Sequence, residues 1–341
     1  MTTFPGVDSD LSGVMQAVFA KHAAAGEQDA SVFDGALWEE LTGLGLARLT
    51  GSEDSGGSGA GWLEAAELLS AAAASGVRAP LAEHDLLACS LLEAAGLPVD
   101  DRLRTLAEVD VDGLALAVAW ARCAQRLVLV WPAGGGWLVA DVDPSGTTEI
   151  VPGTNVIGEP RDGVSVDLGA VQGTPIEGSL VEQHRRKGAV ARAVQVCAAL
   201  DRALALSCEH ATTRHQFGRP LSRFQAVQHL IADMAAECAL ARAATEAALA
   251  AAMRTDWAGD EVLFRIAVAR SCAGHAATTV VRNAHQVHGA IGTAIEHDLH
   301  RFTRAALAWR AEFGSVDQWD RRLAAIVRDA GSDGLWSLIA D

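Results

Sequence analysis

The spacing of apolar residues changes twice along this chain of 341 residues, and that change constrains the fold more than any other feature. Up to about residue 105, and again from about residue 180, apolar residues recur every three or four positions, as on one face of a helix. Between these stretches stand short apolar runs separated by turn residues, as in strands. The order predicts an α+β fold, mainly α, with an N-terminal helical domain (1–105), a shortened middle β domain (106–178) and a C-terminal helical bundle (179–341).

The N-terminal region predicts four helices. Gly43 and Gly45, the glycine- and serine-rich loop 52–61 and the break 77–80 separate them. Residues 8–25 carry Leu11, Met15, Val18 and Phe19 at helical spacing. Further helices are expected over the three ranges 33–41, 62–74 and 84–95.

The middle region predicts a small sheet. Apolar runs over 126–131 and 137–142 flank a glycine-containing loop, which is typical of a hairpin. Residues 114–120, 148–151 and 164–168 add strand-like pieces.

The C-terminal region predicts long packed helices. One stripe is interpreted as core and not as a site; it steps by three and four through Phe224, Val227, Ile231, Met234 and Cys238. A second stripe follows the same rule, and its small residues indicate closely packed helices. It comprises Val262, Ile266, Ala269, Ala273, Ala276 and Val280.

Charge and cysteine usage exclude several classes of function. The 27 basic and 43 acidic residues give a formal net charge of −16, which disfavours nucleic-acid and membrane-surface binding. No basic-then-apolar leader and no apolar stretch of membrane-spanning length is present, so we expect a cytoplasmic protein. Six scattered cysteines without a Cys-x-x-Cys pair are expected to be reduced, buried thiols.

The segment Arg214–Leu221, read Arg-His-Gln-Phe-Gly-Arg-Pro-Leu, ends one long helix just before another begins at Phe224-Gln225. An arginine there offers fixed, always-charged donors for a diphosphate, and the next helix adds unpaired N–H groups at its N-terminus. The plainer alternative is that Arg214 caps the helix that it follows.

A second segment, Gln286–Gly292, reads Gln-Val-His-Gly-Ala-Ile-Gly. Gly289, Ala290 and Gly292 leave backbone exposed where a large planar cofactor can approach, although they are also an ordinary helix stop. Four histidines lie close together in this part of the sequence, but no carboxylate or cysteine pattern completes a metal site, so none is expected. They are His285, His288, His297 and His300.

These two blocks, in this order, resemble the acyl-CoA dehydrogenase family. The opening helical residues 37–46 and the loop 53–59 resemble it too, so the likeness covers nearly the whole chain. The resemblance implies a C-terminal four-helix bundle and an FAD-dependent oxidoreductase that desaturates an acyl-CoA thioester. Carried over by position, it implies that Arg214 and Phe217 meet FAD across a subunit interface, and that Gln225 also contacts the cofactor. Gln286 to Gly289, with Ala290, would meet its adenosine-diphosphate end.

The sequence departs from the family where the catalytic base belongs. The reaction needs a carboxylate aimed at the α-carbon. The two family positions for it fall on Phe313 and Gly188, neither of which can abstract a proton. Glu312 is one residue away from the first position. A one-residue insertion or deletion could restore it, but a step along a helix turns a side chain by about 100°. We favour the alternative that Glu312 is a solvated acid at a helix end.

The Thr-Glu-Pro stretch that opens the family's β domain is also missing from residues 106–130. With both departures, the chain resembles the short, base-lacking subunits of actinobacterial heterotetrameric enzymes that act on CoA thioesters of steroids. The resemblance implies an α2β2 assembly whose second acyl-CoA dehydrogenase subunit supplies the base, with an electron-transferring flavoprotein as electron acceptor. Two alternatives stay open: a homo-oligomer that is active through Glu312, and a structural partner subunit that binds no flavin.

Overall fold

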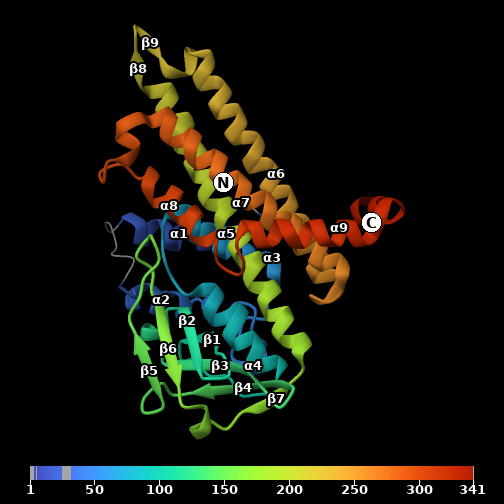
Figure 1. The fold of residues 1–341 in the computed structure, drawn as a ribbon. Helices are drawn as coiled ribbons and strands as arrows, with labels where there is room; N and C mark the ends of the chain where they lie inside the picture. The colour runs from blue at the N-terminus through green and yellow to red at the C-terminus, as the bar shows by residue number, and fades with distance from the viewer. Residues whose placement is uncertain (1–3, 5, 25–31, 341) are drawn as a thin grey trace. The chain divides into compact units, whose positions relative to one another are not determined.

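The computed structural model describes residue 4 and residues 6–24 and 32–340. Contacts group them into two compact units, an N-terminal unit that ends at Gly188 and a C-terminal unit that begins at Ala189. The boundary falls inside one long helix, α5 (Gly178–Thr213). The predicted α+β fold, mainly helical, is confirmed (Figure 1), while the division into three domains stays a prediction.

The N-terminal unit opens with helices where the apolar spacing predicts them. Asp34 caps the second helix, because its side chain accepts a hydrogen bond from the backbone N–H of Leu37 at 3.0 Å. Met15 and Phe19 of the first helix are fully buried, as their spacing predicts. The helices are α1 (Ser9–Ala24), α2 (Gly35–Gly43), α3 (Trp62–Ser75) and α4 (Ser90–Ala94), and a π-helical segment, Ala82–Cys89, precedes α4 directly.

The helix predicted over 84–95 differs from expectation in its first half. There the turns are wider than in an α-helix, and the backbone N–H of Ser90 donates to the carbonyl of Asp85, five residues back. This segment buries polar side chains. Asp85 Oδ2 accepts from the N–H and the hydroxyl of Thr50, both at 2.9 Å. His84 Nδ1 accepts from the backbone N–H of Arg104 at 3.0 Å. Burial raises the pKa of Asp85 to about 6 and lowers the pKa of His84 to about 3.

Two sheets complete the unit. The predicted hairpin is confirmed, because β3 and β4 pair antiparallel around Gly134 and Gly135, both of which have the positive φ that a tight hairpin turn requires. β1 pairs parallel with β3, which alternation alone did not predict. One sheet has the order β1 (Arg104–Glu108), β3 (Arg126–Ala133), β4 (Gly136–Val142), β7 (Thr174–Ile176). The other has the order β2 (Leu114–Ala119), β6 (Arg161–Val166), β5 (Thr148–Val151).

β3 is the core of this unit, because both of its faces are buried. Leu127, Leu129 and Trp131 point into a cluster shared with β2 and β6. Val128 and Val130 point to the opposite side, into a cluster that includes Leu91 and Leu92 of α4. A run that is apolar at every position, such as 127–131, is the sequence signature of such a strand.

The C-terminal unit is helical. In it α6 and α7 run side by side in opposite directions (Figure 1), and Asn283 near the end of α7 donates to the carbonyl of Leu230 near the start of α6, at 3.4 Å. Besides its part of α5, the unit contains a short hairpin of β8 (His215–Gln216) and β9 (Arg219–Pro220), and then α6 (Gln225–Thr255) and α7 (Asp260–His288). A 3₁₀ turn, Gly289–Thr293, leads to α8 (Leu299–Trp309) and α9 (Val316–Ala340).

The two predicted apolar stripes differ in how far they are buried. All six residues of the α7 stripe are buried, as expected. On the α6 stripe, Met234 and Cys238 are buried, but Phe224, Val227 and Ile231 are only half-buried. The expectation of core is therefore confirmed for the middle of α6 and wrong for its first two turns.

All six cysteines are free thiols, as predicted. Three are buried and two are half-buried, but Cys208 is exposed, because it lies on the outer face of α5; the expectation of burial was wrong for that residue. Within the described residues, no helix is both long enough and apolar enough to cross a membrane.

Candidate functional site

The residues singled out for cofactor contacts gather at one end of the C-terminal unit. α5 ends there, the β8–β9 hairpin follows, α6 begins, and α7 returns to the same end (Figure 1). All six side chains or backbone positions are exposed in the isolated chain. They are Arg214, Phe217, Gln225, Gln286, Gly289 and Ala290.

The tip of the β8–β9 hairpin presents an aromatic ring to solvent. Phe217 is 90% exposed, and its φ of +54° is a left-handed conformation that bulky side chains rarely adopt. The ring stands edge-on to Phe224 at 6.2 Å, and the Arg219 guanidinium lies over the Phe224 ring, 4.2 Å from its centroid. An exposed aromatic held in a strained turn is the kind of feature that a binding partner covers.

The Arg214 guanidinium is available for a ligand. Only the backbone of Arg214 is bonded, its N–H donating to the carbonyl of His210 at 2.9 Å. Among the described residues the Arg214 side chain forms no hydrogen bond or ion pair. It therefore does not cap the end of α5, as the plainer alternative would have it. Gln225, the first residue of α6, adds an exposed amide beside free backbone N–H groups.

The end of α7 offers accessible backbone. Gly289 stops the helix with φ +63° and ψ −143°, and a Cβ built there would meet no atom within 4 Å. Gln286 and Ala290 flank it and are exposed. An exposed cation, amides, open backbone and an aromatic fit one end of a dinucleotide such as FAD.

Glu312 lies elsewhere in the same unit and is engaged in an ion pair. It sits in the turn after α8, where its Oε2 accepts from Arg192 Nε at 2.7 Å. The carboxylate-bearing side chain is 20% exposed, and that of Arg192 is 3% exposed. The interpretation of Glu312 as a solvated acid is therefore wrong, because α5 supplies a buried cation 120 positions earlier in the chain.

A second buried arginine holds the turn that carries Glu312. Arg270 of α7 donates to the carbonyls of Arg310, Glu312 and Gly314 at 2.9, 2.7 and 3.2 Å. Burial, and next the charge of Arg192, lowers the pKa of Arg270 to about 10. Phe313, at one family base position, has a φ of +54° in this turn, and Gly188, at the other, is buried in α5.

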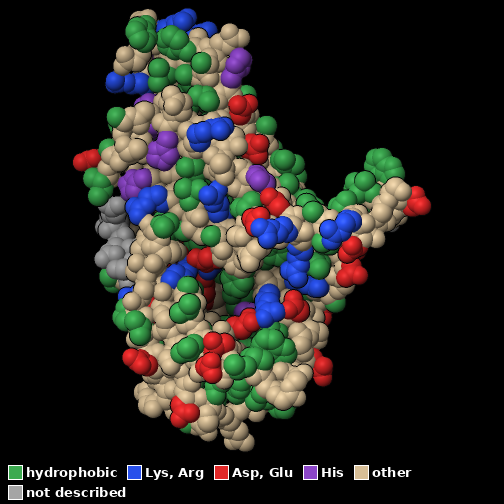
Figure 2. Space-filling model, in the orientation of Figure 1, with side chains coloured by type: hydrophobic (Ala, Val, Ile, Leu, Met, Phe, Trp, Pro, Cys, Tyr) green, Lys and Arg blue, Asp and Glu red, His purple; other side chains and the backbone are tan. Residues whose placement is uncertain are grey.

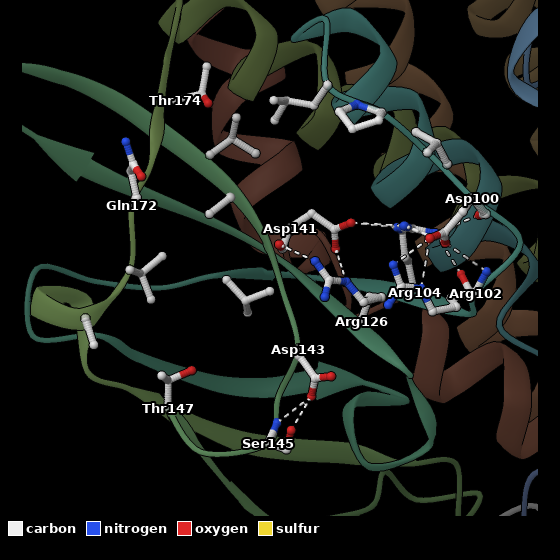
Figure 3. Close-up of a pocket in the computed structure, with 18 residues that line it drawn as sticks. Asp100, Arg102, Arg104, Arg126, Asp141, Asp143, Ser145, Thr147, Gln172 and Thr174 are labelled. Atoms are coloured by element: carbon white, nitrogen blue, oxygen red, sulfur yellow. Dashed lines mark hydrogen bonds and ion pairs between the residues drawn. The ribbon is translucent and has the colours of Figure 1, made fainter.

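The N-terminal unit contains a cavity of about 650 Å³ between the loop before β1 and the strands β3, β4 and β7 (Figure 3). Its cations are matched by carboxylates. Arg104 and Arg126 both bond to Asp141, and Arg102 bonds to Asp100 at 2.5 Å. Hydrogen bonds from Arg102 hold the pKa of Asp100 below its usual range. With its positive charge already paired, this cavity is a poor receptor for a diphosphate.

His210 was not among the predicted site residues. His210 of α5 lies with His288 and His297, and one ring nitrogen from each is within 4.8 Å of those of the other two. The expectation of no metal site considered only histidines close together in sequence. No local signal identifies His210, because α5 meets the end of α7 only after folding.

Comparison with known proteins places these features in context. Family models for the acyl-CoA dehydrogenase N-terminal domain and C-terminal domain match residues 9–98 and 183–325. Acyl-CoA dehydrogenase FadE34 of Mycobacterium tuberculosis is 28% identical over 308 residues, which cover 84% of this chain and 41% of the relative. Acyl-CoA dehydrogenase IpdE2 of the same organism is 28% identical over 313 residues, covering 87% and 89%. The chain thus spans less than half of the first relative and most of the second.

Solved structures share the fold. The ChsE4–ChsE5 complex from Mycobacterium tuberculosis matches with a TM-score of 0.81 and 20% identity, covering 95% of this chain and 98% of the other. A variant of the Tcur3481–Tcur3483 steroid ACAD matches with a TM-score of 0.82 and 21% identity, with the same coverage. At these identities the likeness concerns the fold alone.

Proposed function

The chain belongs to the acyl-CoA dehydrogenase family, and from this premise we propose that it is one subunit of a flavin-dependent enzyme that desaturates a CoA thioester. In this proposal the subunit works in an α2β2 complex and contributes Arg214, Phe217, Gln225 and Gln286 to FAD sites shared with its partner. The partner supplies the catalytic base, and an electron-transferring flavoprotein accepts the electrons.

The observation that carries the proposal is the unpaired, exposed end of the C-terminal unit. An isolated chain that leaves Phe217 90% exposed and the first two turns of α6 half-buried has an uncovered surface there. A second subunit and a shared cofactor would cover it. Two structural neighbours are named as two-component proteins, one a complex and one a steroid ACAD, which supports both a heteromeric assembly and a steroid-type thioester.

The flavin would supply the hydride acceptor, and this chain's own residues would bind and orient it. The Arg214 guanidinium provides fixed charge for the diphosphate, and the open backbone at Gly289 lets the adenosine end approach. No residue at the family base positions can take a proton, which is why the proposal assigns that step to the partner.

Two rival functions remain to be separated. A homo-oligomer active through Glu312 would need that carboxylate to reach an acyl-CoA, yet it is bonded to buried Arg192. A structural subunit that binds no flavin would have no need of an unpaired arginine beside an open helix end.

The first experiment is the visible absorption spectrum of the chain, alone and co-expressed with a candidate partner, a longer acyl-CoA dehydrogenase that carries a base glutamate. We expect a colourless chain alone and a yellow heterotetramer together. A chain that is yellow alone and bleached by an acyl-CoA would instead support the self-sufficient enzyme.

Arg214→Ala in the co-expressed complex then tests the shared site. Flavin content should fall, whereas Arg321→Ala, which removes an exposed arginine from α9, should leave it unchanged. Equal flavin in wild type and Arg214→Ala would refute the shared site and favour the structural role.

A further inference from the structure

Three imidazoles from separate segments converge at the end of α7. His210 comes from the last turn of α5, His288 is the last residue of α7, and His297 lies just before α8. The rings of His210 and His288 are stacked with centroids 4.5 Å apart, and His297 stands edge-on to His288 at 4.8 Å. Figure 2 shows several histidine side chains on the surface of the helices of the C-terminal unit.

Two glycines bring the third ring into place. Gly289 ends α7 in a left-handed conformation, so the chain turns back over the helix end. Gly292 then passes so close that a Cβ there would lie 2.8 Å from the Cβ of His288 and 3.0 Å from Leu299 Cδ2. Only a residue without a side chain allows the loop that carries His297 to pack against His288.

One ring nitrogen of His288 is buried and unsatisfied within the described part of the chain. The residue is 5% exposed, and its Nδ1 donates to the carbonyl of Ala284 at 2.8 Å. That bond fixes the proton on Nδ1 and leaves a lone pair on Nε2, which is buried and has no hydrogen-bond partner among the described residues. A ring N–H held by a backbone carbonyl, with the other nitrogen free, is the arrangement typical of a metal-binding histidine.

We propose that His210, His288 and His297 form a binding site for a divalent transition-metal ion of the zinc class, with an open fourth position. Three imidazole nitrogens suit Zn²⁺, Ni²⁺, Co²⁺ or Cu²⁺ better than the oxygen-seeking Mg²⁺ or Ca²⁺. A solvent molecule or an anion would complete the coordination, because the cluster formed by the described residues contains no carboxylate or thiol.

The nitrogens must move closer together before they can share one ion. In a tetrahedral site, metal–nitrogen bonds of about 2.0–2.1 Å put two ligand atoms about 3.4 Å apart, whereas these nitrogens lie within 4.8 Å of one another. His210 and His297 are half-buried, so their rings have room to turn. His297 Nδ1 also accepts from the backbone N–H of Leu299 at 3.1 Å. If His297 binds the metal through Nε2, its proton moves to Nδ1. The hydrogen bond from Leu299 is then lost and a metal bond replaces it.

The bond from Nδ1 of His288 to the carbonyl of Ala284 leaves the lone pair of Nε2 free for a ligand. A neutral imidazole is the species that ligates a metal. The site stands on the geometry of the C-terminal unit alone and does not depend on the proposed function.

The test is direct metal binding to the tag-free, full-length chain after treatment with a chelator. Zn²⁺ is titrated by calorimetry, and Co²⁺ is followed by its visible d–d absorption, which reports the coordination directly. We expect one ion per chain with an affinity in the micromolar range or tighter. His210→Ala and His297→Ala, at half-buried positions that tolerate truncation, should each weaken binding at least about 10-fold.

His275→Ala is the matched control, since His275 lies on α7, is 62% exposed and pairs with Asp320 away from the cluster. It should bind as wild type does, and circular dichroism checks that every variant is folded. His288→Gln, which removes the buried ligand, should abolish the cobalt absorption. The proposal is overturned if wild type binds no metal, if the cluster variants bind as tightly as wild type, or if His275→Ala loses as much affinity as they do.

Discussion

Removal of the Glu312 carboxylate should destabilise the C-terminal unit by far more than removal of an exposed acid. In the structure Glu312 neutralises Arg192, whose side chain is 3% exposed, and Arg270 lies close enough for the two cations to repel each other. When one partner of a buried pair is lost, the other charge stays buried, which costs about 3–5 kcal/mol. Arg192 keeps a hydrogen bond to Gln195 at 2.6 Å, so for Glu312→Ala we expect the lower end, about 3 kcal/mol.

Glu312→Gln should cost less, about 1–2 kcal/mol, because the amide oxygen can still accept from Arg192 Nε. The assay is urea unfolding followed by tryptophan fluorescence, with Trp309 and Trp319 both buried in this unit. At a slope of about 2 kcal/mol per molar urea, Glu312→Ala should lower the midpoint by about 1.5 M.

The matched control is Glu261→Ala. Its partner Arg254 is 57% exposed and Glu261 itself 41%, so the loss should stay below about 1 kcal/mol. Equal midpoints for Glu312→Ala and Glu261→Ala would refute the reasoning from burial. Enzyme assays on the same Glu312→Gln protein test whether Glu312 is the catalytic base. Activity retained with flavin bound would exclude Glu312 as the base, and activity lost with normal flavin content would support it.

Three further outcomes are expected. The pKa of Asp85 is raised from 3.8 to about 6, so between these pH values the folded chain binds more protons than the unfolded chain. The free energy of unfolding should therefore fall by about 3 kcal/mol as pH rises through this range. Urea midpoints measured from pH 4 to pH 7 should show this fall in wild type and not in Asp85→Asn. Gly113→Ala should destabilise the fold by more than about 1 kcal/mol, because φ is +77° and the new Cβ would lie 2.1 Å from the carbonyl oxygen of Val166. Gly13→Ala, in α1, should stabilise the fold by about 0.5–1 kcal/mol, because its new Cβ would meet no atom within 4 Å. Thermal melts that rank the two variants the other way would contradict both expectations. Met234→Ala, fully buried on α6, should cost about 2–5 kcal/mol in the same unfolding assay, and a change below 0.5 kcal/mol would show that this turn of α6 is not core.

Apolar spacing predicted most of the elements, because helix and strand periods are local properties. The α7 stripe and the β3–β4 hairpin are where the pattern put them. Apolar spacing predicts burial less well where contacts between distant segments decide which face of a helix is covered. The first turns of α6 carry the same spacing as its core yet stay half-buried, because no other segment among the described residues covers them.

By itself, the sequence determined the family and the helix–sheet–helix order, and it singled out Arg214, Phe217 and Gln286 as candidate contacts, since short motifs and local periods carry that information. Only the tertiary structure decided the partners of isolated polar residues. Glu312 became half of a buried ion pair, and His210 joined His288 and His297, because helices distant in sequence meet in the bundle. Neither the ion pair nor the histidine cluster can be predicted from one residue alone. The cost of burying a charge and the convergence of ligands both depend on which neighbours folding brings to that residue.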